Sequence, residues 1–196
     1  MCDTSKLKQL KFFMAFKGKT LHNPVSGQTI TFIQTGKDTN GKLLEMETVY
    51  RSRSVIPAEH YHPFQDEYFT VIEGEVRVKL DGKTSMLRTG DTLHIPANMR
   101  HAMWNPGSSK AVVNWQVRPA LTTEYLFETT WGLAADGKVN KNGMPNMLQL
   151  ALTVSKFSDV FRVIKPPVII QKVLFGLITP VAYLLGYRPT YNRYLN

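Results

Sequence analysis

Between Thr20 and about Arg118, short stretches of alternating apolar and polar residues are separated at close intervals by turn-forming dipeptides. Asn40-Gly41 and Asp81-Gly82 are the clearest, because tight hairpin turns need the positive φ that asparagine, aspartate and glycine tolerate. No helical period separates the stretches, so the pattern predicts an antiparallel sandwich or barrel rather than a parallel sheet. The other dipeptides of this kind are Ser26-Gly27, Glu73-Gly74, Thr89-Gly90 and Pro106-Gly107.

After Pro119 the apolar residues follow a helical period instead. A first helix is predicted over about 122–135, where a threonine can cap its N-terminus. A second helix is predicted to start near Pro145, since proline suits the first turn of a helix, and to run to about residue 154. A third segment, from Pro167 to Leu185, is apolar almost all round.

The length of 196 residues fits one ordinary domain with an extension. We predict a basic N-terminal segment at 1–19, a barrel at 20–119, and a helical extension with a C-terminal tail at 120–196. The formal net charge of +9 raises the question of a nucleic-acid partner. Beyond the basic N-terminal segment at 1–19, the lysines and arginines are scattered and form no motif that recognises nucleic acids. We therefore expect no nucleic-acid partner.

Two features near the N-terminus indicate the cellular location. The only cysteine is Cys2, so no disulfide can form within the chain. The apolar cluster from Phe12 to Phe16 is flanked by lysines and is too short for the core of an export signal. The expected location is therefore the cytoplasm.

The segment from Pro167 to Leu185 leaves a membrane question open. As a helix it would extend about 28 Å, close to the thickness of a bilayer's hydrocarbon core. Gln171, Lys172 and Pro180 disfavour an isolated spanning helix. Three arrangements remain: packing on the barrel or on a partner subunit, which is favoured; peripheral contact with a membrane surface; and spanning.

Candidate site residues precede the predicted turn at Glu73-Gly74. His60 and His62 are two apart, so both imidazoles face one side if this stretch is a strand. Glu67 begins the next strand, and Phe69 and Val71 share its face. A carboxylate and two imidazoles can therefore meet in one cavity.

At these positions the chain resembles the cupin superfamily, in particular its small single-barrel members. The resemblance adds His101 to the candidate site and implies a mainly β, double-stranded β-helix, the jelly-roll barrel of cupins, with a metal near its middle. It also implies pairing into a homodimer. Two motif glycines are replaced, by Ser54 and Asn98, of which asparagine still tolerates left-handed backbone geometry. The matching positions are His60, His62, Glu67 and Gly74 in the first motif and Gly90, Pro96, His101 and Asn105 in the second.

Three imidazoles and one carboxylate suit a divalent transition metal (Fe, Mn, Ni, Cu or Zn) better than Ca or Mg, which prefer oxygen ligands. The predicted metal ligands are His60, His62, Glu67 and His101. Four protein ligands on an octahedral ion leave two positions open, as in catalytic rather than purely structural sites.

Several other side chains could belong to the pocket. Phe69, Val71, Met103 and Trp115 fall on strand positions that could line it, and core packing explains them equally well. Arg51 and Arg53 could bind an anionic substrate, although a surface position is favoured. His22 and His94 lie outside the motifs and are interpreted as ordinary strand histidines.

The favoured function is a metal-dependent oxygenase, a dioxygenase acting on a small organic substrate inside the barrel, with Glu67 as ligand and candidate proton acceptor. One alternative is an isomerase or epimerase, whose metal polarises a carbonyl group. The other is a non-catalytic module that binds a small molecule, because a fold does not by itself settle a function.

Overall fold

The computed structural model describes residues 15–164 and 167–195. The N-terminal segment predicted at 1–19 therefore lies mostly outside the described residues, as do Cys2 and the first part of the apolar cluster from Phe12 to Phe16.

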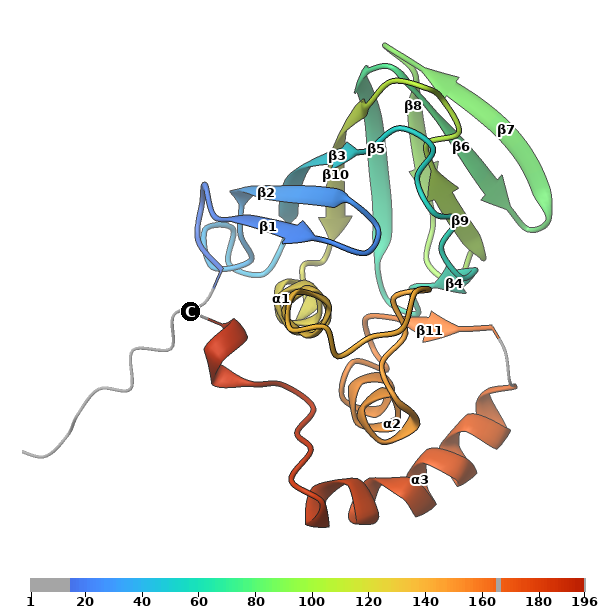
Figure 1. Cartoon of the computed structure of the whole chain (residues 1–196). Coiled ribbons are helices and arrows are strands. Elements are labelled where there is room, and N and C mark those ends of the chain that lie inside the picture. Colours follow the sequence, from blue (N-terminus) through green and yellow to red (C-terminus); the bar gives the residue numbers. More distant parts are fainter. Residues whose placement is uncertain (1–14, 165–166, 196) are drawn as a thin grey trace, which may run out of the picture.

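Two antiparallel sheets make up the barrel (Figure 1). The six-stranded sheet has the order β1-β2-β3-β10-β5-β8 and the five-stranded sheet the order β11-β4-β9-β6-β7. The mainly β fold with a C-terminal helical extension, predicted from the turn pattern and the resemblance, is confirmed. The strands of the first sheet are β1 (Thr20–Asn23), β2 (Gln28–Gln34), β3 (Leu44–Tyr50), β10 (Ala111–Arg118), β5 (Asp66–Glu73) and β8 (Thr92–Ile95). Those of the second are β11 (Arg162–Val163), β4 (His60–Tyr61), β9 (His101–Trp104), β6 (Glu75–Leu80) and β7 (Lys83–Arg88).

The hairpin between β6 and β7 shows why the turn dipeptides were informative. Asp81 and Gly82 have φ values of 43° and 85°, so both adopt the left-handed geometry that their residue types permit. Gly74, at the turn from β5 to β6, has φ 78°, and a Cβ there would lie 2.6 Å from the carbonyl oxygen of Lys110. This turn therefore requires glycine for both its geometry and its close approach.

Two apolar clusters fill the barrel region. The first lies within the barrel and includes Phe69, Val71 and Met103. The second lies between β1–β3 and the helix α1 (Thr123–Ala135), where Trp131 packs against strand residues such as Phe32. The strand pattern positions these clusters, because alternate residues of each strand point to the buried face.

The extension forms three helices on one side of the barrel (Figure 1). They are α1, α2 (Met147–Lys156) and α3 (Val168–Leu184), close to the predicted segments. Two details of their N-termini differ. Thr122 lies at the N-cap position of α1, but its side chain forms no capping hydrogen bond. Pro145 lies outside α2. The N-cap of α2 is Asn146, whose side chain accepts a hydrogen bond from the backbone N–H of Gln149 at 3.0 Å. Among the described residues, no helix is long and apolar enough to cross a membrane.

The end of the chain folds back on these helices. Tyr191 donates its hydroxyl proton to Gln149 Oε1 of α2 at 2.6 Å. The ring of Tyr194 lies so close to Gly132 of α1 that a Cβ on this glycine would be 2.3 Å from it. Tyr191 and Tyr194 thus bind the C-terminal tail to α2 and α1 of the same chain.

The extension also returns to the barrel between α2 and α3. Strand β11 pairs with β4, and this pairing sets Val163 opposite His60. The predicted division at 119/120 stays a prediction, but the extension contributes a strand beside the first candidate ligand.

Candidate metal centre

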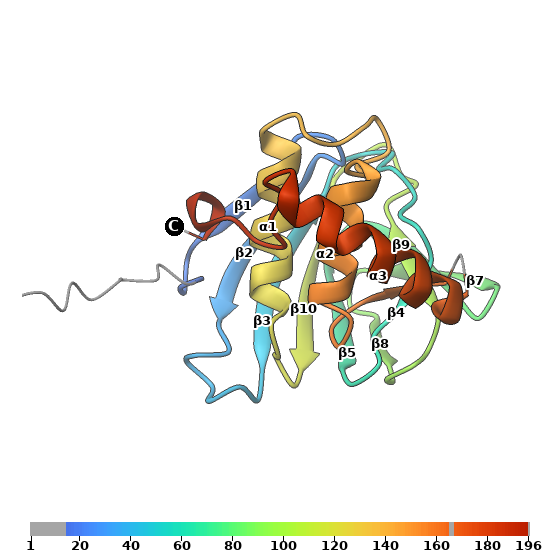
Figure 2. The ribbon, with the colours of Figure 1, turned by 90° about the horizontal axis from the view of Figure 1, so that it is seen from below.

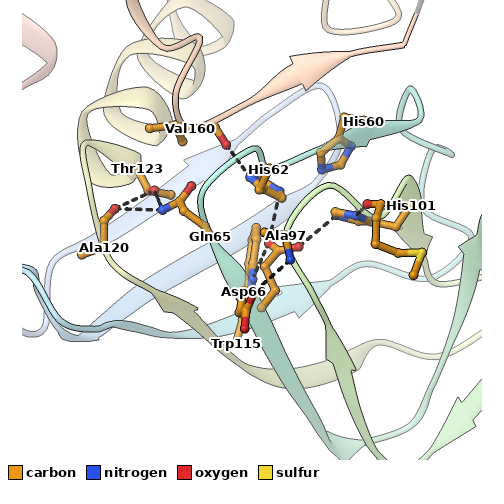
Figure 3. Close-up of polar contacts among 12 residues, drawn as sticks. His60, His62, Gln65, Asp66, Ala97, His101, Trp115, Ala120, Thr123 and Val160 are labelled. Atoms are coloured by element: carbon orange, nitrogen blue, oxygen red, sulfur yellow. Dashed lines mark hydrogen bonds and ion pairs between the residues drawn. The ribbon is translucent and has the colours of Figure 1, made fainter.

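His60, His62 and His101 come together at one end of the five-stranded sheet (Figure 3). His60 on β4 is the direct partner of His101 on β9, which brings their ring centroids to 4.4 Å. His62 follows β4 rather than lying in it, yet its ring is 5.2 Å from that of His60. The three histidines offer ligand atoms that all lie within 4.8 Å of one another.

Each imidazole is oriented by a hydrogen bond on its far nitrogen. In all three histidines Nδ1 contacts a backbone carbonyl oxygen, which can only accept, so Nδ1 carries the proton. A neutral ring in this tautomer keeps a lone pair on Nε2, the nitrogen left for a metal. The acceptors for His60, His62 and His101 are the carbonyls of Ala58, Val160 and Met99, at 3.0, 2.6 and 2.9 Å.

Glu67 lies against two of the three rings. Its Oε1 is 3.3 Å from Nε2 of His62, and its Oε2 is 2.9 Å from Nε2 of His101. Trp115 donates its indole N–H to Oε1 at 3.0 Å. The carboxylate is fully buried on β5, on the same face as Phe69 and Val71. The three ligand atoms that lie within 4.8 Å of one another belong to the histidines and not to Glu67. The role of Glu67 as fourth ligand therefore stays a prediction.

The donor set fits a cation. His62 Nε2 and Glu67 Oε2 are both buried without a hydrogen-bond partner of good geometry. In the tautomers above, the lone pairs of the imidazoles face those of the carboxylate, an arrangement that is unfavourable unless a proton or a metal ion lies between them. A divalent ion would satisfy all these lone pairs at once.

The local electrostatics favour a neutral His60 and an ionised Glu67, whereas they favour the protonated form of His101. Burial is the main cause that lowers the pKa of His60 to about 3, and the neighbouring imidazoles lower it further. Burial opposes ionisation of Glu67, but the histidines outweigh it and bring the pKa of the carboxyl to about 2. For His101, burial is outweighed by the contact with Glu67, and its pKa is raised. A carboxylate of such low pKa suits a ligand better than a proton acceptor.

The helical extension covers this site, which the sequence reasoning missed. Val160 supplies the carbonyl that accepts from His62, and the ring of Phe161 lies 4.9 Å from that of His60 and 6.5 Å from that of His62. Neither residue belongs to a recognisable motif, and the contact joins residues 98 positions apart. No local signal in the sequence marks it.

The two motif departures are accommodated in turns. Asn98 has φ 66°, the left-handed geometry expected at a glycine position. Ser54 accepts a hydrogen bond from the backbone N–H of Asn105 at 2.8 Å through its hydroxyl. Neither replacement disturbs the ligands.

Other predicted pocket residues are mostly buried. Phe69, Val71 and Met103 belong to the barrel core, and Trp115 is partly buried between the two clusters. This placement does not separate lining from packing, so their pocket role stays a prediction. His94 pairs with Asp66 on the exposed side of β8, as expected for an ordinary strand histidine.

The arginines Arg51 and Arg53 are both exposed. Arg51 donates to the carbonyl of Val25. Their surface position matches the favoured interpretation.

Comparison with known proteins agrees with this geometry. Residues 48–117 match the family model described as "Cupin domain". This part of the chain is a cupin domain, and it carries three histidines placed to bind a metal.

Named relatives extend the comparison. The chain is 42% identical over 62 residues to the polyketide synthase CurC of Streptomyces cyaneus, a match that covers 32% of this chain and 40% of that protein. It is 32% identical over 85 residues to quercetin 2,3-dioxygenase of Bacillus subtilis, covering 43% of this chain and 23% of that one. It is 27% identical over 177 residues to the probable oxidoreductase virH of Hypocrea virens, covering 81% and 79%. The matches to the Streptomyces proteins span less than half of those proteins.

Proposed function

We propose that this protein is a metal-dependent oxygenase that acts on a small organic molecule. The observation that carries the proposal is the convergence of three imidazoles, each with its Nδ1 directed to a backbone carbonyl, beside the buried Glu67 carboxylate. Such a set holds a divalent transition metal through deprotonated ligands and leaves positions open for other molecules.

The residues of the chain have distinct roles in this proposal. His60, His62, His101 and Glu67 would hold the ion, which when bound would supply redox chemistry between dioxygen and the substrate. Trp115 fixes the carboxylate by its hydrogen bond to Oε1. Phe161 covers the histidines from the side of the extension, and its apolar ring excludes water.

The relatives support the substrate class. One is named a quercetin dioxygenase, one a probable oxidoreductase, and two are connected by name with polyketide synthesis. Quercetin is a planar phenolic molecule, and Phe161 offers a ring on which such a molecule could stack. Planar phenols are therefore the first substrates to test.

The test begins with metal identity in natively purified protein, prepared without chelators or a nickel column. The metal-free protein is then loaded separately with Fe(II), Mn(II), Ni(II), Cu(II) or Zn(II), and dioxygen uptake is measured with a flavonol, an aromatic polyketide, a diketone and a thiol. We expect uptake with a redox-active metal and its loss in His101→Ala. Uptake should be retained in His94→Ala, because this imidazole is exposed on β8 and pairs with Asp66. Absence of uptake with every metal and substrate would remove most of the support for oxygenase chemistry.

A second candidate function is a binding module without turnover. The specific observation in its favour is that Val160, Phe161 and β11 lie against His60 and His62 on the side of the extension. Ligand affinity that is lost in His62→Ala, without turnover in the wild type, would support this function. Zinc as the native metal together with turnover of a sugar or keto acid would instead support isomerase chemistry.

A further inference from the structure

Helix α3 has one buried side and a broad apolar side that faces outward. Gln171, Phe175 and Ala182 point into the protein, where Phe175 packs against Ala151 and Val154 of α2. Figure 1 and Figure 2 show α3 lying along α2 on the outside of the molecule. The exposed apolar residues of α3 and its C-cap, defined here as the outer face, are Ile169, Ile170, Val173, Leu174, Leu177, Val181, Leu184 and Leu185.

The outer face is more apolar than an ordinary protein surface. Ile169, Leu177 and Leu184 are 78%, 72% and 88% exposed, on a helix that is about 25 Å long. Single exposed apolar residues are common, but a contiguous apolar strip of this kind marks a contact with a partner or a membrane.

The charge around the outer face indicates which kind of partner fits. In the sequence from 137 to 196 there are eight lysine and arginine residues and one acidic residue, Asp159, a net charge of +7, although one of these cations, Arg193, is paired with Asp136. Lys172 is exposed on α3 itself, and α3 contains no Asp or Glu. At the end of α3, the guanidinium of Arg188 lies over the half-exposed ring of Tyr183, 5.6 Å from its centroid. Tyrosine and basic residues beside an apolar face are typical of the boundary between lipid headgroups and acyl chains.

We propose that the outer face of α3 binds the surface of an anionic lipid bilayer. The apolar side chains would enter the upper part of the acyl layer, while Lys172 and Arg188 would reach the lipid phosphates. A symmetric pairing of two copies fits the charge less well, because it would place two faces without acidic residues, each carrying Lys172, against one another. The proposal does not depend on the metal chemistry, and the homodimer expected from the sequence stays a separate prediction.

The test is flotation of the full-length protein with lipid vesicles. One vesicle preparation contains phosphatidylcholine only, and the other contains phosphatidylcholine with phosphatidylserine. The variant Leu177→Glu places a charge in the centre of the outer face, and Lys172→Gln removes one cation. Ile72→Glu is the matched control, because Ile72 is also exposed (52%) but lies on β5, away from the helices. Thermal unfolding verifies that each variant is folded, as expected for changes at exposed positions.

We expect the wild type to float with the anionic vesicles and to bind neutral vesicles much more weakly. Leu177→Glu should weaken binding by about tenfold or more, and Lys172→Gln by roughly fivefold, while Ile72→Glu should match the wild type. The proposal is wrong if neither preparation binds the protein, or if Leu177→Glu binds as well as the wild type. It is also wrong if no vesicle binds and light scattering detects a dimer that Leu177→Glu dissociates, since the outer face would then bind a second copy.

Discussion

Replacing Trp115 by phenylalanine tests whether the Glu67 carboxylate takes part in metal binding. The substitution removes the indole N–H that donates to Oε1 at 3.0 Å but keeps an aromatic ring between Phe69 and Phe127, whose ring centroids lie 5.5 and 5.3 Å away. A hydrogen bond to an ionised group contributes about 1.5–3 kcal/mol. If the bond holds the carboxylate in its metal-binding position, its loss weakens metal affinity by about 10- to 100-fold, the range typical of groups that orient metal ligands.

The assay is competition between the metal-free protein and a chromophoric chelator for Zn(II), chosen because zinc has no redox chemistry that could complicate the measurement. Trp131→Phe is the matched control, since Trp131 is a buried tryptophan of α1 that packs in the second cluster. We expect weak zinc binding in Trp115→Phe only, with both variants still folded. Zinc affinity within twofold of the wild type in Trp115→Phe, or an equal loss in the control, would refute the reasoning.

Three further predictions concern other residues. His101→Ala should abolish stoichiometric zinc binding, while His94→Ala should leave the affinity within about twofold, measured by the same competition. Phe161→Ala should speed the removal of zinc by a chelator several-fold, measured by stopped flow, because the ring that covers His60 is lost; an unchanged rate would show that Phe161 does not restrict access. Burial is the main cause that raises the pKa of Glu124 above 4.5, so the stability it contributes is present at acidic pH and lost as pH rises through the raised pKa. Glu124→Gln should therefore gain stability relative to the wild type as the pH rises from acidic values through the raised pKa of Glu124, measured by urea denaturation, and a constant difference between the two proteins would contradict this.

Some parts of the candidate site could be predicted because their rules are local. Residues that are two positions apart on a strand point to the same face. Glu67, Phe69 and Val71 were therefore placed together correctly, and they are buried on one side of β5. The ligand histidines required more than parity. His62 lies beyond the two-residue strand β4, and His101 was found by the spacing of a family motif rather than by a periodicity.

The extension shows the limit of such rules. The sequence predicted three helices and their approximate bounds, because helical periodicity is visible within a single segment. It did not predict that the chain returns between α2 and α3 to pair with β4, nor that Val160 and Phe161 contact the histidines. A two-residue strand and one carbonyl have no pattern of their own.

The sequence by itself therefore determined the β-rich barrel region, its turns and the approximate helices, since steric preference and side-chain alternation act between near neighbours. The candidate ligands came from the spacing of family motifs as well. Only the tertiary structure decided how those ligands are held. The indole of Trp115 reaches Glu67 across 48 positions of the chain, and the carbonyl of Val160 reaches His62 across 98. Contacts of this range depend on how sheets and helices pack after the chain has closed its long loops, and side-chain type or local spacing does not encode that closure.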